Sequence, residues 1–158
     1  MTSPAHERDK SAPTQLPPAP EATSPSARAV MVGNRGSDTG PERALRSALH
    51  ARGLRFFKNR SPVRGVRCRA DVVFPTERVA VFVDGCFWHR CPTHGVSPRA
   101  NSDYWRAKLD RNVARDRRDN ESLSEAGWYV VRVWEHEDPG RAAEKVADQV
   151  LSRRRSPA

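Results

Sequence analysis

The sequence VAVFVDGCFWHRCPTH, residues 79–94, decides the fold. Its first five residues are all apolar, which is typical of a strand that is buried on both faces of a sheet. Asp84 and Gly85 then end the strand. The next nine residues combine thiols, imidazoles and large aromatic rings, namely Cys86, Phe87, Trp88, His89, Cys91 and His94. We therefore expect a central strand that leads directly into a chemically active loop.

Patterns on either side of this stretch predict a single α/β domain. Runs of β-branched and aromatic residues predict strands at 55–58, 70–74, 79–85 and 128–134. Helical periodicity and capping signals predict helices at 39–53, 101–127 and 141–155. The string Thr39-Gly-Pro-Glu42 has the form of a capping box at the start of the first helix. The strands at 70–74 and 79–85 are close enough in sequence to form a hairpin, which would bring Asp71 beside the end of the second strand.

The N-terminal region differs in composition from the rest. Six of the 13 prolines lie within the first 28 residues, which contain no aromatic side chain. Such a segment buries too little apolar surface to offset its ordering entropy. We therefore predict a disordered extension over residues 1–30 and a folded domain over residues 31–155.

The charge of the chain points to a polyanionic partner. The formal net charge is +9, and residues 1–30 contribute nothing to it, because they hold three basic and three acidic residues. A domain this basic favours nucleic acid, although a merely solvated basic surface is the alternative. No apolar run approaches the roughly 20 residues of a membrane span, and the N-terminus lacks the apolar core of a secretory signal. We expect a cytoplasmic protein without a membrane partner, with reduced thiols.

Two thiols and nearby histidines predict a zinc site. Cys86 and Cys91 are five residues apart, His94 follows three residues later, and His136 comes after the last predicted strand. Two thiolates and two imidazoles suit a tetrahedral structural zinc. His89 is an alternative imidazole ligand, and two buried thiols with two surface histidines are the alternative to any metal site.

Acids and a histidine predict a second, catalytic centre. Asp71 and Asp84 would lie at neighbouring strand ends, where paired carboxylates often bind Mg²⁺, unless both are simply solvated turn residues. His89 is the residue type of a general base, and Asp116 on the long helix could orient it. Glu42 has two interpretations, as the reciprocal cap of its helix or as an acid directed at the metal.

Aromatic residues flank this centre. Phe87 and Trp88 lie on the predicted loop, and Trp105 lies near the start of the long helix. On a basic domain, exposed rings can stack on bases or wedge between base steps. The alternative is that they cover the zinc loop as a small second core.

These motifs together resemble the very short patch repair (Vsr) endonucleases over about residues 31–140. The matching segments, in the order of the family, are DTGPE (38–42), RADVVF (69–74), VFVDGCFWHRC (81–91), YWRAKLDRNVARDRRD (104–119) and GWYVVRVWE (127–135).

The resemblance implies a restriction-endonuclease-like core of the PD-(D/E)xK type, with a mixed sheet flanked by helices and a structural zinc loop. It implies a Mg²⁺-dependent DNA endonuclease, a hydrolase that nicks one strand 5′ to the T of a T:G mismatch. Such mismatches arise by deamination of 5-methylcytosine, and the nick initiates very short patch repair. The expected partner is double-stranded DNA with a T:G mismatch. We expect a monomer in the bacterial cytoplasm that associates with the nucleoid when it acts.

The resemblance also implies roles for individual residues. The catalytic set is Asp71, His89, Asp116 and Glu42. The magnesium ligands that it implies are Asp71 and the Val83 carbonyl, and Asp84 is the further candidate that its place at the neighbouring strand end suggests. The zinc ligands are Cys86, Cys91, His94 and His136. The DNA-binding residues are Met31, Phe87, Trp88, Trp105, Lys108 and Asn112.

Two residues depart from the best-known members, which carry a histidine at the position of Asp84 and a cysteine at the position of His136. Imidazole replaces thiolate readily as a zinc ligand, so the zinc site is expected to persist. Two other functions remain open from the sequence. One is a zinc-stabilised DNA-binding module without catalysis, and the other is a restriction-type nuclease of the same fold.

Overall fold

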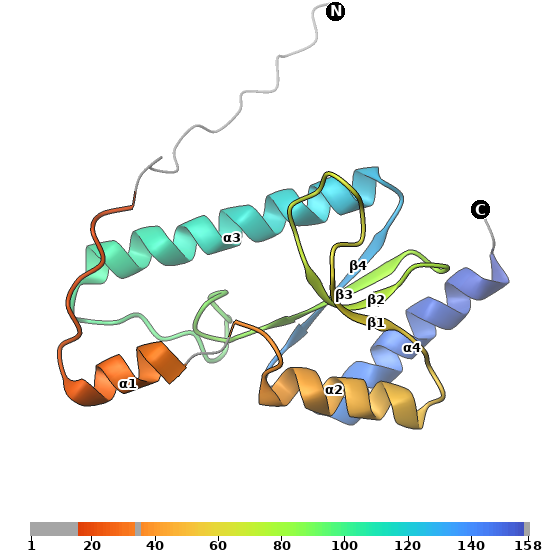
Figure 1. Cartoon of the computed structure of the whole chain (residues 1–158), viewed down its shortest axis with the longest axis horizontal. Coiled ribbons are helices and arrows are strands. Elements are labelled where there is room, and N and C mark those ends of the chain that lie inside the picture. Colours follow the sequence, from red (N-terminus) through yellow and green to blue (C-terminus); the bar gives the residue numbers. More distant parts are fainter. Residues whose placement is uncertain (1–15, 34–35, 157–158) are drawn as a thin grey trace, which may run out of the picture.

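A computed structural model describes the backbone of residues 16–33 and 36–156 (Figure 1). Side chains are described for residues 16–29 and 36–156. Eight elements follow in chain order: α1 (Pro25–Gly33), α2 (Gly40–Ala51), β1 (Phe57–Arg60), β2 (Ala70–Phe74), β3 (Val79–Asp84), α3 (Ser102–Glu125), β4 (Tyr129–Trp134) and α4 (Pro139–Arg155). The predicted strands and the three predicted helices are all present.

The strands form one mixed sheet in the order β1-β2-β3-β4. The β1–β2 and β2–β3 pairs are antiparallel, which confirms the predicted hairpin, whereas β3 and β4 are parallel. The long helix α3 makes the crossover that a parallel pair requires. Because β3 and β4 are parallel, their C-terminal ends lie side by side, and the loops that follow them start from the same end of the sheet.

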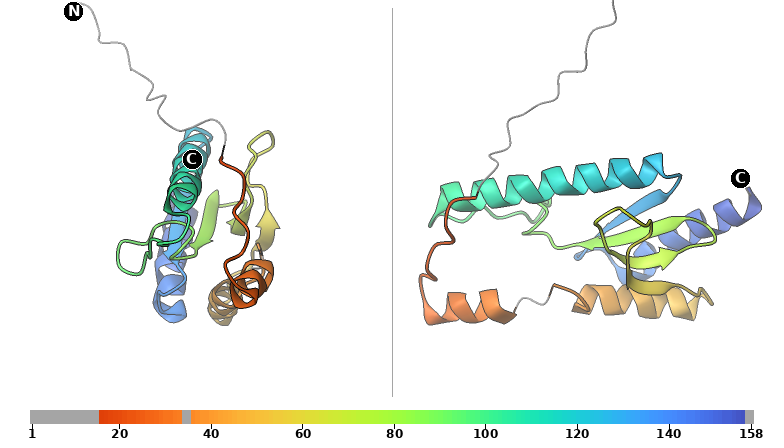
Figure 2. Two further views of the ribbon diagram at one scale, coloured as in Figure 1. Left: turned by 90° about the vertical axis from the view of Figure 1, so that its left-hand side faces the viewer. Right: turned by 45° about the horizontal axis from the view of Figure 1, so that its top comes forward.

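Helices cover both faces of the sheet (Figures 1 and 2). Helices α2 and α4 pack together on one face, and α3 crosses the other. The larger core lies under α2 and α4 and contains Leu45, Leu49, Phe74 and Val146. The smaller core lies on the α3 side and includes Phe82 and Leu123. The central strand β3 is thus buried on both faces, as its apolar run predicts.

Local signals explain where the helices begin and end. Thr39 caps α2 by accepting a hydrogen bond from the Glu42 amide, and Asp138 caps α4 by accepting one from the Arg141 amide. Helix α3 begins at Ser102, and Asn101 precedes it in a left-handed conformation without a side-chain cap. Gly127 follows α3 with φ of 81°, a conformation that glycine adopts without steric cost.

Two features differ from the expectations. Helix α1 crosses the predicted boundary at residue 30 between the extension and the folded domain, where no helix was predicted. Strand β1 begins two residues later than predicted, because it is an edge strand with three of its four residues exposed and thus has little hydrophobic pattern. Residues 1–15 of the predicted extension lie outside the described residues. Within the described ranges, no helix is both long and apolar enough to cross a bilayer.

Candidate active site and metal centre

A cleft of about 340 Å³ opens where α2, β2, β3 and α3 meet. Its lining includes every residue predicted to be catalytic or to bind magnesium: Glu42, Asp71, Val83, Asp84, His89 and Asp116. These residues come from α2, β2, β3, the loop after β3, and α3, and they span positions 42 to 116 of the sequence. The fold therefore assembles the predicted set in one place.

Asp71 is fixed at the base of this cleft. It is the second residue of β2, and its Oδ2 accepts a hydrogen bond of 2.7 Å from the Val83 amide of β3. Burial raises the pKa of Asp71 to about 6, the Val83 hydrogen bond opposes this, and the neighbouring charges of Glu42 and Asp84 raise it further. The carboxyl group therefore lies in a partly dehydrated site with an excess of negative charge.

Glu42 caps its helix, as one interpretation predicts, and its side chain also lines the cleft. Its carboxylate accepts hydrogen bonds from the Asp38 amide at 2.7 Å and from the Thr39 hydroxyl at 3.1 Å, so it caps the start of α2. The same side chain is buried and lines the cleft. Arg46, one helical turn later, forms ion pairs with both Glu42 and Asp38. The cap thus holds an acid in a defined position beside Asp71.

His89 and Asp116 form a close pair. The His89 Nδ1 atom lies 2.5 Å from Asp116 Oδ2, although the two residues are 27 positions apart. With a proton on Nδ1 directed at Asp116, the Nε2 atom is left to exchange protons within the cleft. The pairing matches the arrangement of a base and the carboxylate that orients it.

Arg132 of β4 adds a cation that the sequence analysis did not include. Its Nη1 lies 2.7 Å from Asp84 Oδ1 and 3.5 Å from Asp116 Oδ1. Asp84 also lies 3.7 Å from His89 Nδ1. Burial raises the pKa of Asp84, and the charges of Arg132 and His89 oppose this shift. Asp84 is therefore engaged by a guanidinium rather than exposed in the cleft.

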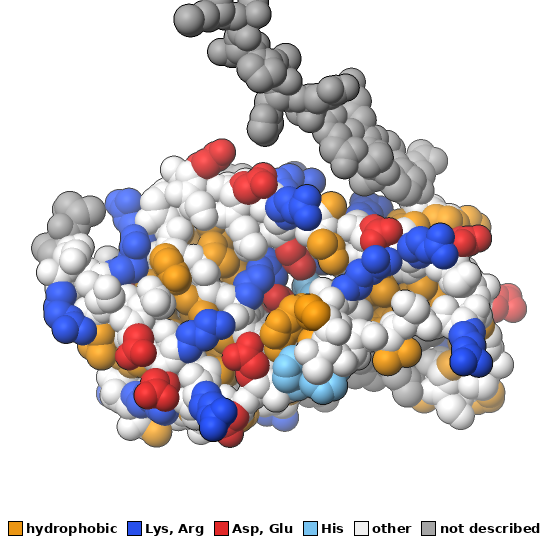
Figure 3. Space-filling view, turned by 180° about the vertical axis from the view of Figure 1, so that it is seen from behind, with side chains coloured by type: hydrophobic (Ala, Val, Ile, Leu, Met, Phe, Trp, Pro, Cys, Tyr) orange, Lys and Arg blue, Asp and Glu red, His pale blue; other side chains and the backbone are white. Residues whose placement is uncertain are grey.

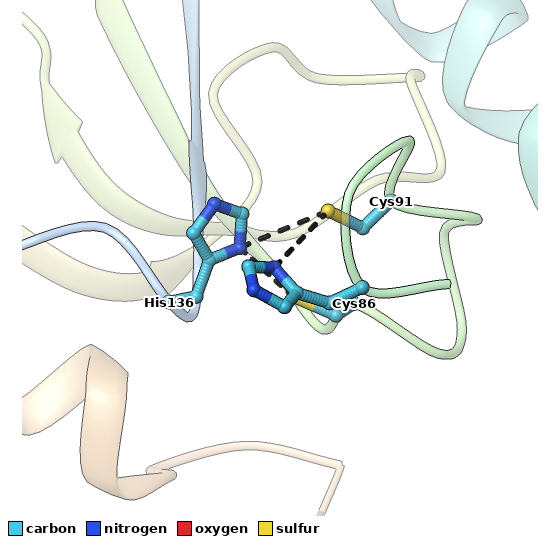
Figure 4. A group of neighbouring side chains, drawn as sticks. Cys86, Cys91 and His136 are labelled. Carbon is cyan, nitrogen blue, oxygen red and sulfur yellow. Dashed lines mark hydrogen bonds between the residues drawn. The ribbon is translucent and has the colours of Figure 1, made fainter. Parts of the chain in front are cut away.

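The four predicted zinc ligands come together at the edge of the sheet where β3 and β4 end. Figure 4 shows the cysteines of the loop after β3 directed toward His136, which follows β4. His136 Nδ1 lies 3.1 Å from Cys86 Sγ and 3.7 Å from Cys91 Sγ, and His94 Nδ1 lies 4.0 Å from Cys91 Sγ. All four ligand atoms lie within 4.8 Å of one another.

The backbone of the zinc loop is tightly folded. The Cys91 amide donates to the Cys86 carbonyl at 2.9 Å, and the Gly95 amide donates to the Cys91 carbonyl at 2.8 Å. A Cβ atom at Gly95 would lie 2.5 Å from the Cys91 carbonyl oxygen, so this position accepts only glycine without rearrangement. The Cys86 amide donates to Glu135 Oε1 at 2.7 Å, which ties the loop to the end of β4. His89 belongs to the same loop but contacts Asp116, not the cysteine cluster.

The predicted DNA-contacting aromatics form one cluster. The ring centroids of Phe87, Trp88 and Trp105 lie 5.0–6.0 Å apart. The Lys108 Nζ atom lies above the Trp88 and Trp105 rings at 5.4 and 5.3 Å. Asn112 donates a hydrogen bond to the Trp88 carbonyl at 3.1 Å. In the protein alone, Lys108 and Asn112 therefore brace the aromatic cluster.

A cavity of about 660 Å³ separates this cluster from the N-terminal segment. The three rings line one side, and residues 20–23 and 26–27, at and before the start of α1, line the other. Met31 belongs to α1, but its side chain lies outside the described part of the structure.

One face of the molecule carries both charged and histidine side chains (Figure 3). Basic side chains are spread over the face shown in Figure 3, with acidic ones between them. A group of histidine side chains also reaches the surface of this face. His94 and His136 are both exposed, and their rings lie 4.3 Å apart. The Cys/His cluster thus has buried thiols and exposed imidazoles.

Comparisons with known proteins identify the fold and the family of this chain. The fold is that of the restriction-endonuclease-like enzymes: the catalytic domain of the homing endonuclease I-Bth0305I superposes with a TM-score of 0.51 at 19% identity, covering 73% of this chain and 98% of that one. A family model described as DNA mismatch endonuclease Vsr matches residues 22–94. The chain belongs to this Vsr family of endonucleases.

Similar proteins carry two kinds of name. The type II nicking enzyme V.NaeI of Lentzea aerocolonigenes is 53% identical over 121 residues, which cover 75% of this chain and 72% of the relative. The type II nicking enzyme V.XorIIP of Xanthomonas oryzae pv. oryzae is 41% identical over 111 residues, or 70% of this chain and 79% of the relative. The DNA mismatch endonuclease Vsr of Escherichia coli K12 is 40% identical over 119 residues, or 74% and 72%.

Proposed function

We propose that the protein is a Mg²⁺-dependent DNA endonuclease that nicks one strand 5′ to the T of a T:G mismatch and so initiates very short patch repair. The observation that carries this proposal is the cleft that brings Asp71, Glu42 and the His89–Asp116 pair together. Membership of the Vsr family supports DNA cleavage, and the E. coli relative named a mismatch endonuclease supports the choice of substrate.

The chemistry of the cleft fits a hard divalent cation. Asp71 carries a raised pKa because it is dehydrated and close to other carboxylates, and a bound cation would relieve both effects. We assign its protein ligands to Asp71 and the Val83 carbonyl. When bound there, Mg²⁺ supplies charge neutralisation at the scissile phosphate. Asp84 stays a predicted third ligand, but its ion pair with Arg132 favours the different role argued below.

His89 is the proposed proton acceptor. Asp116 holds the Nδ1 side of the ring, so Nε2 can take a proton from the attacking water. Glu42, fixed by the α2 cap, stands near Asp71 and adds to the negative charge that a cation would neutralise. Asp71 and His89 are each held by a hydrogen bond from another element, and Glu42 is held by the cap of its own helix, which keeps the set preorganised.

The proposed zinc has a structural role. Cys86, Cys91, His94 and His136 offer the two-thiolate, two-imidazole set that closed zinc sites use. Because His89 lies between Cys86 and Cys91, a metal held by these cysteines would also fix the loop that presents the proposed base. Phe87 and Trp88 lie on the same loop, so the proposed wedge against the mismatch would be fixed with it.

A nicking assay tests the function. Duplexes that contain T:G, and matched duplexes of the same sequence, would be incubated with Mg²⁺ or with EDTA, and the products mapped on each strand. We expect one nick 5′ to the T in the T:G duplex, only with Mg²⁺. The variant His89→Ala, prepared in parallel, should be inactive, which excludes a contaminating nuclease.

Other outcomes identify the alternatives. Nicking of one strand of matched DNA at a defined sequence would indicate sequence-directed nicking, which the names of two similar relatives favour. Cleavage of both strands of matched DNA would indicate a restriction-type enzyme. Specific binding of T:G duplex without any cleavage would indicate a DNA-binding module, and each of these results would overturn the proposed function.

A further inference from the structure

Arg132 occupies an unusual position for a charged residue. Its neighbours Val131 and Val133 on β4 face the larger core, whereas Val130 packs on the smaller core beneath α3. Because side chains alternate along a strand, Arg132 lies on the α3 side of the sheet together with Val130. A guanidinium in such a place costs free energy unless its charge is paired and its N–H groups are bonded.

Four contacts hold this guanidinium. Nη1 forms the ion pairs with Asp84 and Asp116 at 2.7 and 3.5 Å, and Nε donates to Asn120 Oδ1 at 3.0 Å. The guanidinium carbon lies 4.7 Å from the centre of the Phe82 ring. The parallel register explains how the Arg132 side chain reaches Asp84. Arg132 is paired with Phe82 of β3, and Phe82 lies two residues before Asp84. The side chain thus joins β3 to α3 across the active-site cleft.

We propose that Arg132 is a positioning residue of the active site, which holds Asp116 in place against His89 and keeps Asp84 paired at the end of β3. This inference rests on the proposed function for its link to nicking. Asp116 Oδ2 lies 2.5 Å from His89 Nδ1, and Asp116 Oδ1 lies 3.5 Å from Arg132 Nη1, so each of its two oxygens has its own partner. A carboxylate held at both oxygens cannot rotate away from the imidazole without losing one partner.

Asp84 has a separate place in this arrangement. Its Oδ1 is shared between Arg132 at 2.7 Å and His89 at 3.7 Å. The carboxylate therefore anchors Arg132 on the strand that also carries Val83, next to the proposed magnesium ligand. An arginine suits this task better than a lysine, because its planar group presents several fixed donors to two acids and an amide at once.

A plain structural ion pair is the competing explanation. In that case Arg132 would only neutralise the buried Asp84, and any loss of activity in a variant would follow from a loss of folding. The two explanations differ for a protein in which both charges are removed together, because the unpaired buried charge is then absent. The contact with Asp116 is still missing in that protein.

The test uses Arg132→Gln, Arg132→Lys and the double variant Asp84→Asn/Arg132→Gln in the full chain. Arg154→Gln is the matched control, since Arg154 makes a 2.6 Å ion pair with Glu77, which precedes β3 at the opposite end from Asp84. Three quantities are measured for each: the thermal midpoint, kcat and KM for the T:G duplex, and the NMR resonance of the His89 Nδ1 proton. The resonance is assigned by its loss in His89→Gln.

We expect Arg132→Gln to lower both the thermal midpoint and kcat, the latter by about tenfold or more, with a smaller change in KM. Arg132→Lys should recover part of kcat. The double variant should regain thermal stability, while its kcat stays low and the His89 resonance stays shifted from its wild-type position. The control should lose stability only.

Recovery of both stability and kcat in the double variant would overturn the proposal and leave Arg132 as a structural ion pair. An unchanged His89 resonance in Arg132→Gln would overturn it as well. If the wild-type protein does not nick T:G duplexes, the proposed function fails, yet the resonance still reports whether Arg132 positions the His89–Asp116 pair. The two failures are therefore distinguishable.

Discussion

His89 and Asp116 meet at 2.5 Å although one lies on a loop after β3 and the other is in the middle of α3. Their contact depends on the crossover helix lying across the sheet and on the folded loop holding its imidazole outward. The pair therefore links the tertiary fold to the proposed proton transfer, and it is the most direct target for mutation.

Replacement of Asp116 by Asn should reduce nicking strongly. The amide is nearly isosteric but carries no charge, and it can present N–H to the imidazole and favour the wrong tautomer. We expect kcat to fall by roughly 10²-fold or more, with duplex binding little changed. Single-turnover nicking and a gel-shift titration would measure the two effects. Asp110→Asn is the matched control, because Asp110 is an exposed residue of the same helix whose partner is Arg90; a similar loss in that variant would contradict the assignment.

The raised pKa of Asp71 predicts an acid limit for nicking. With a pKa of about 6, the carboxyl group is protonated increasingly below pH 6, and a proton then competes with Mg²⁺ for the same oxygens. At a fixed, subsaturating Mg²⁺ concentration, the rate should fall by up to about tenfold per pH unit below this value. Excess Mg²⁺ should move the limit to lower pH. A limit that does not respond to Mg²⁺ would argue against Asp71 as a ligand.

The same shift predicts the effect of Asp71→Asn on stability. The pKa is higher in the folded state than in the unfolded chain, so the stability associated with the protonated group is present at low pH and is lost as the pH rises from about 4 through 6. Removal of the charge should therefore stabilise the metal-free protein at pH 7 to 8, by up to about 3 kcal/mol, while nicking is abolished. Denaturant unfolding in EDTA measures the first effect. Equal or lower stability of the variant would show that the charge of Asp71 does not destabilise the metal-free protein.

Zinc content should depend on Cys86 and Cys91 but not on the third cysteine. The double variant Cys86→Ser/Cys91→Ser should lose the single zinc expected per chain, and with it thermal stability, because structural zinc contributes folding energy directly. Cys68→Ser is the control, since Cys68 is buried in the smaller core, apart from the cluster. Elemental analysis after dialysis gives the stoichiometry. Retention of zinc by the double variant would exclude this ligand set.

The aromatic cluster should govern mismatch selectivity. Trp88→Ala removes a ring that Phe87, Trp105 and Lys108 surround. If the rings contact the mismatch, the T:G duplex should lose about 1–3 kcal/mol of binding, and the matched duplex less. Tyr129→Ala is the control, because Tyr129 is an exposed aromatic at the other end of the β3–β4 pair. Equal losses for both duplexes would mean that the cluster serves only as a core for the zinc loop.

The fold could be predicted from the sequence where apolar patterns are strong. Strand β3 is continuous in apolar residues, and the capping signals at Thr39 and Gly127 are local, so these elements agree closely with expectation. Strand β1 could not be placed as well, because its edge position leaves it without a buried face. Helix α1 lies in a segment whose composition is typical of disorder, and composition alone does not predict a helix there.

Most residues of the candidate site could be predicted from the sequence, but one could not. Residue types and the resemblance pointed to Asp71, His89, Asp116 and the four Cys and His residues, and the structure brings each group together. Arg132 was not predicted, because its role depends on the register between β3 and β4 and on the path of α3, neither of which a single sequence specifies. The only local signal is a charged residue in a strand that is otherwise apolar.

Glu42 both caps α2 and lines the cleft, so the candidate site is complete only while the first turn of α2 is folded. Helix termini fray more readily than sheets unfold, and fraying of α2 would carry this acid away from Asp71 while the core stays intact. Inactivation on warming should thus begin as a local opening, detectable as faster amide exchange near residues 39–43 at temperatures where β3 is still protected. Protection of both segments up to the same temperature would contradict this. We therefore expect one helical turn, rather than the global melting point, to limit the working temperature of this protein.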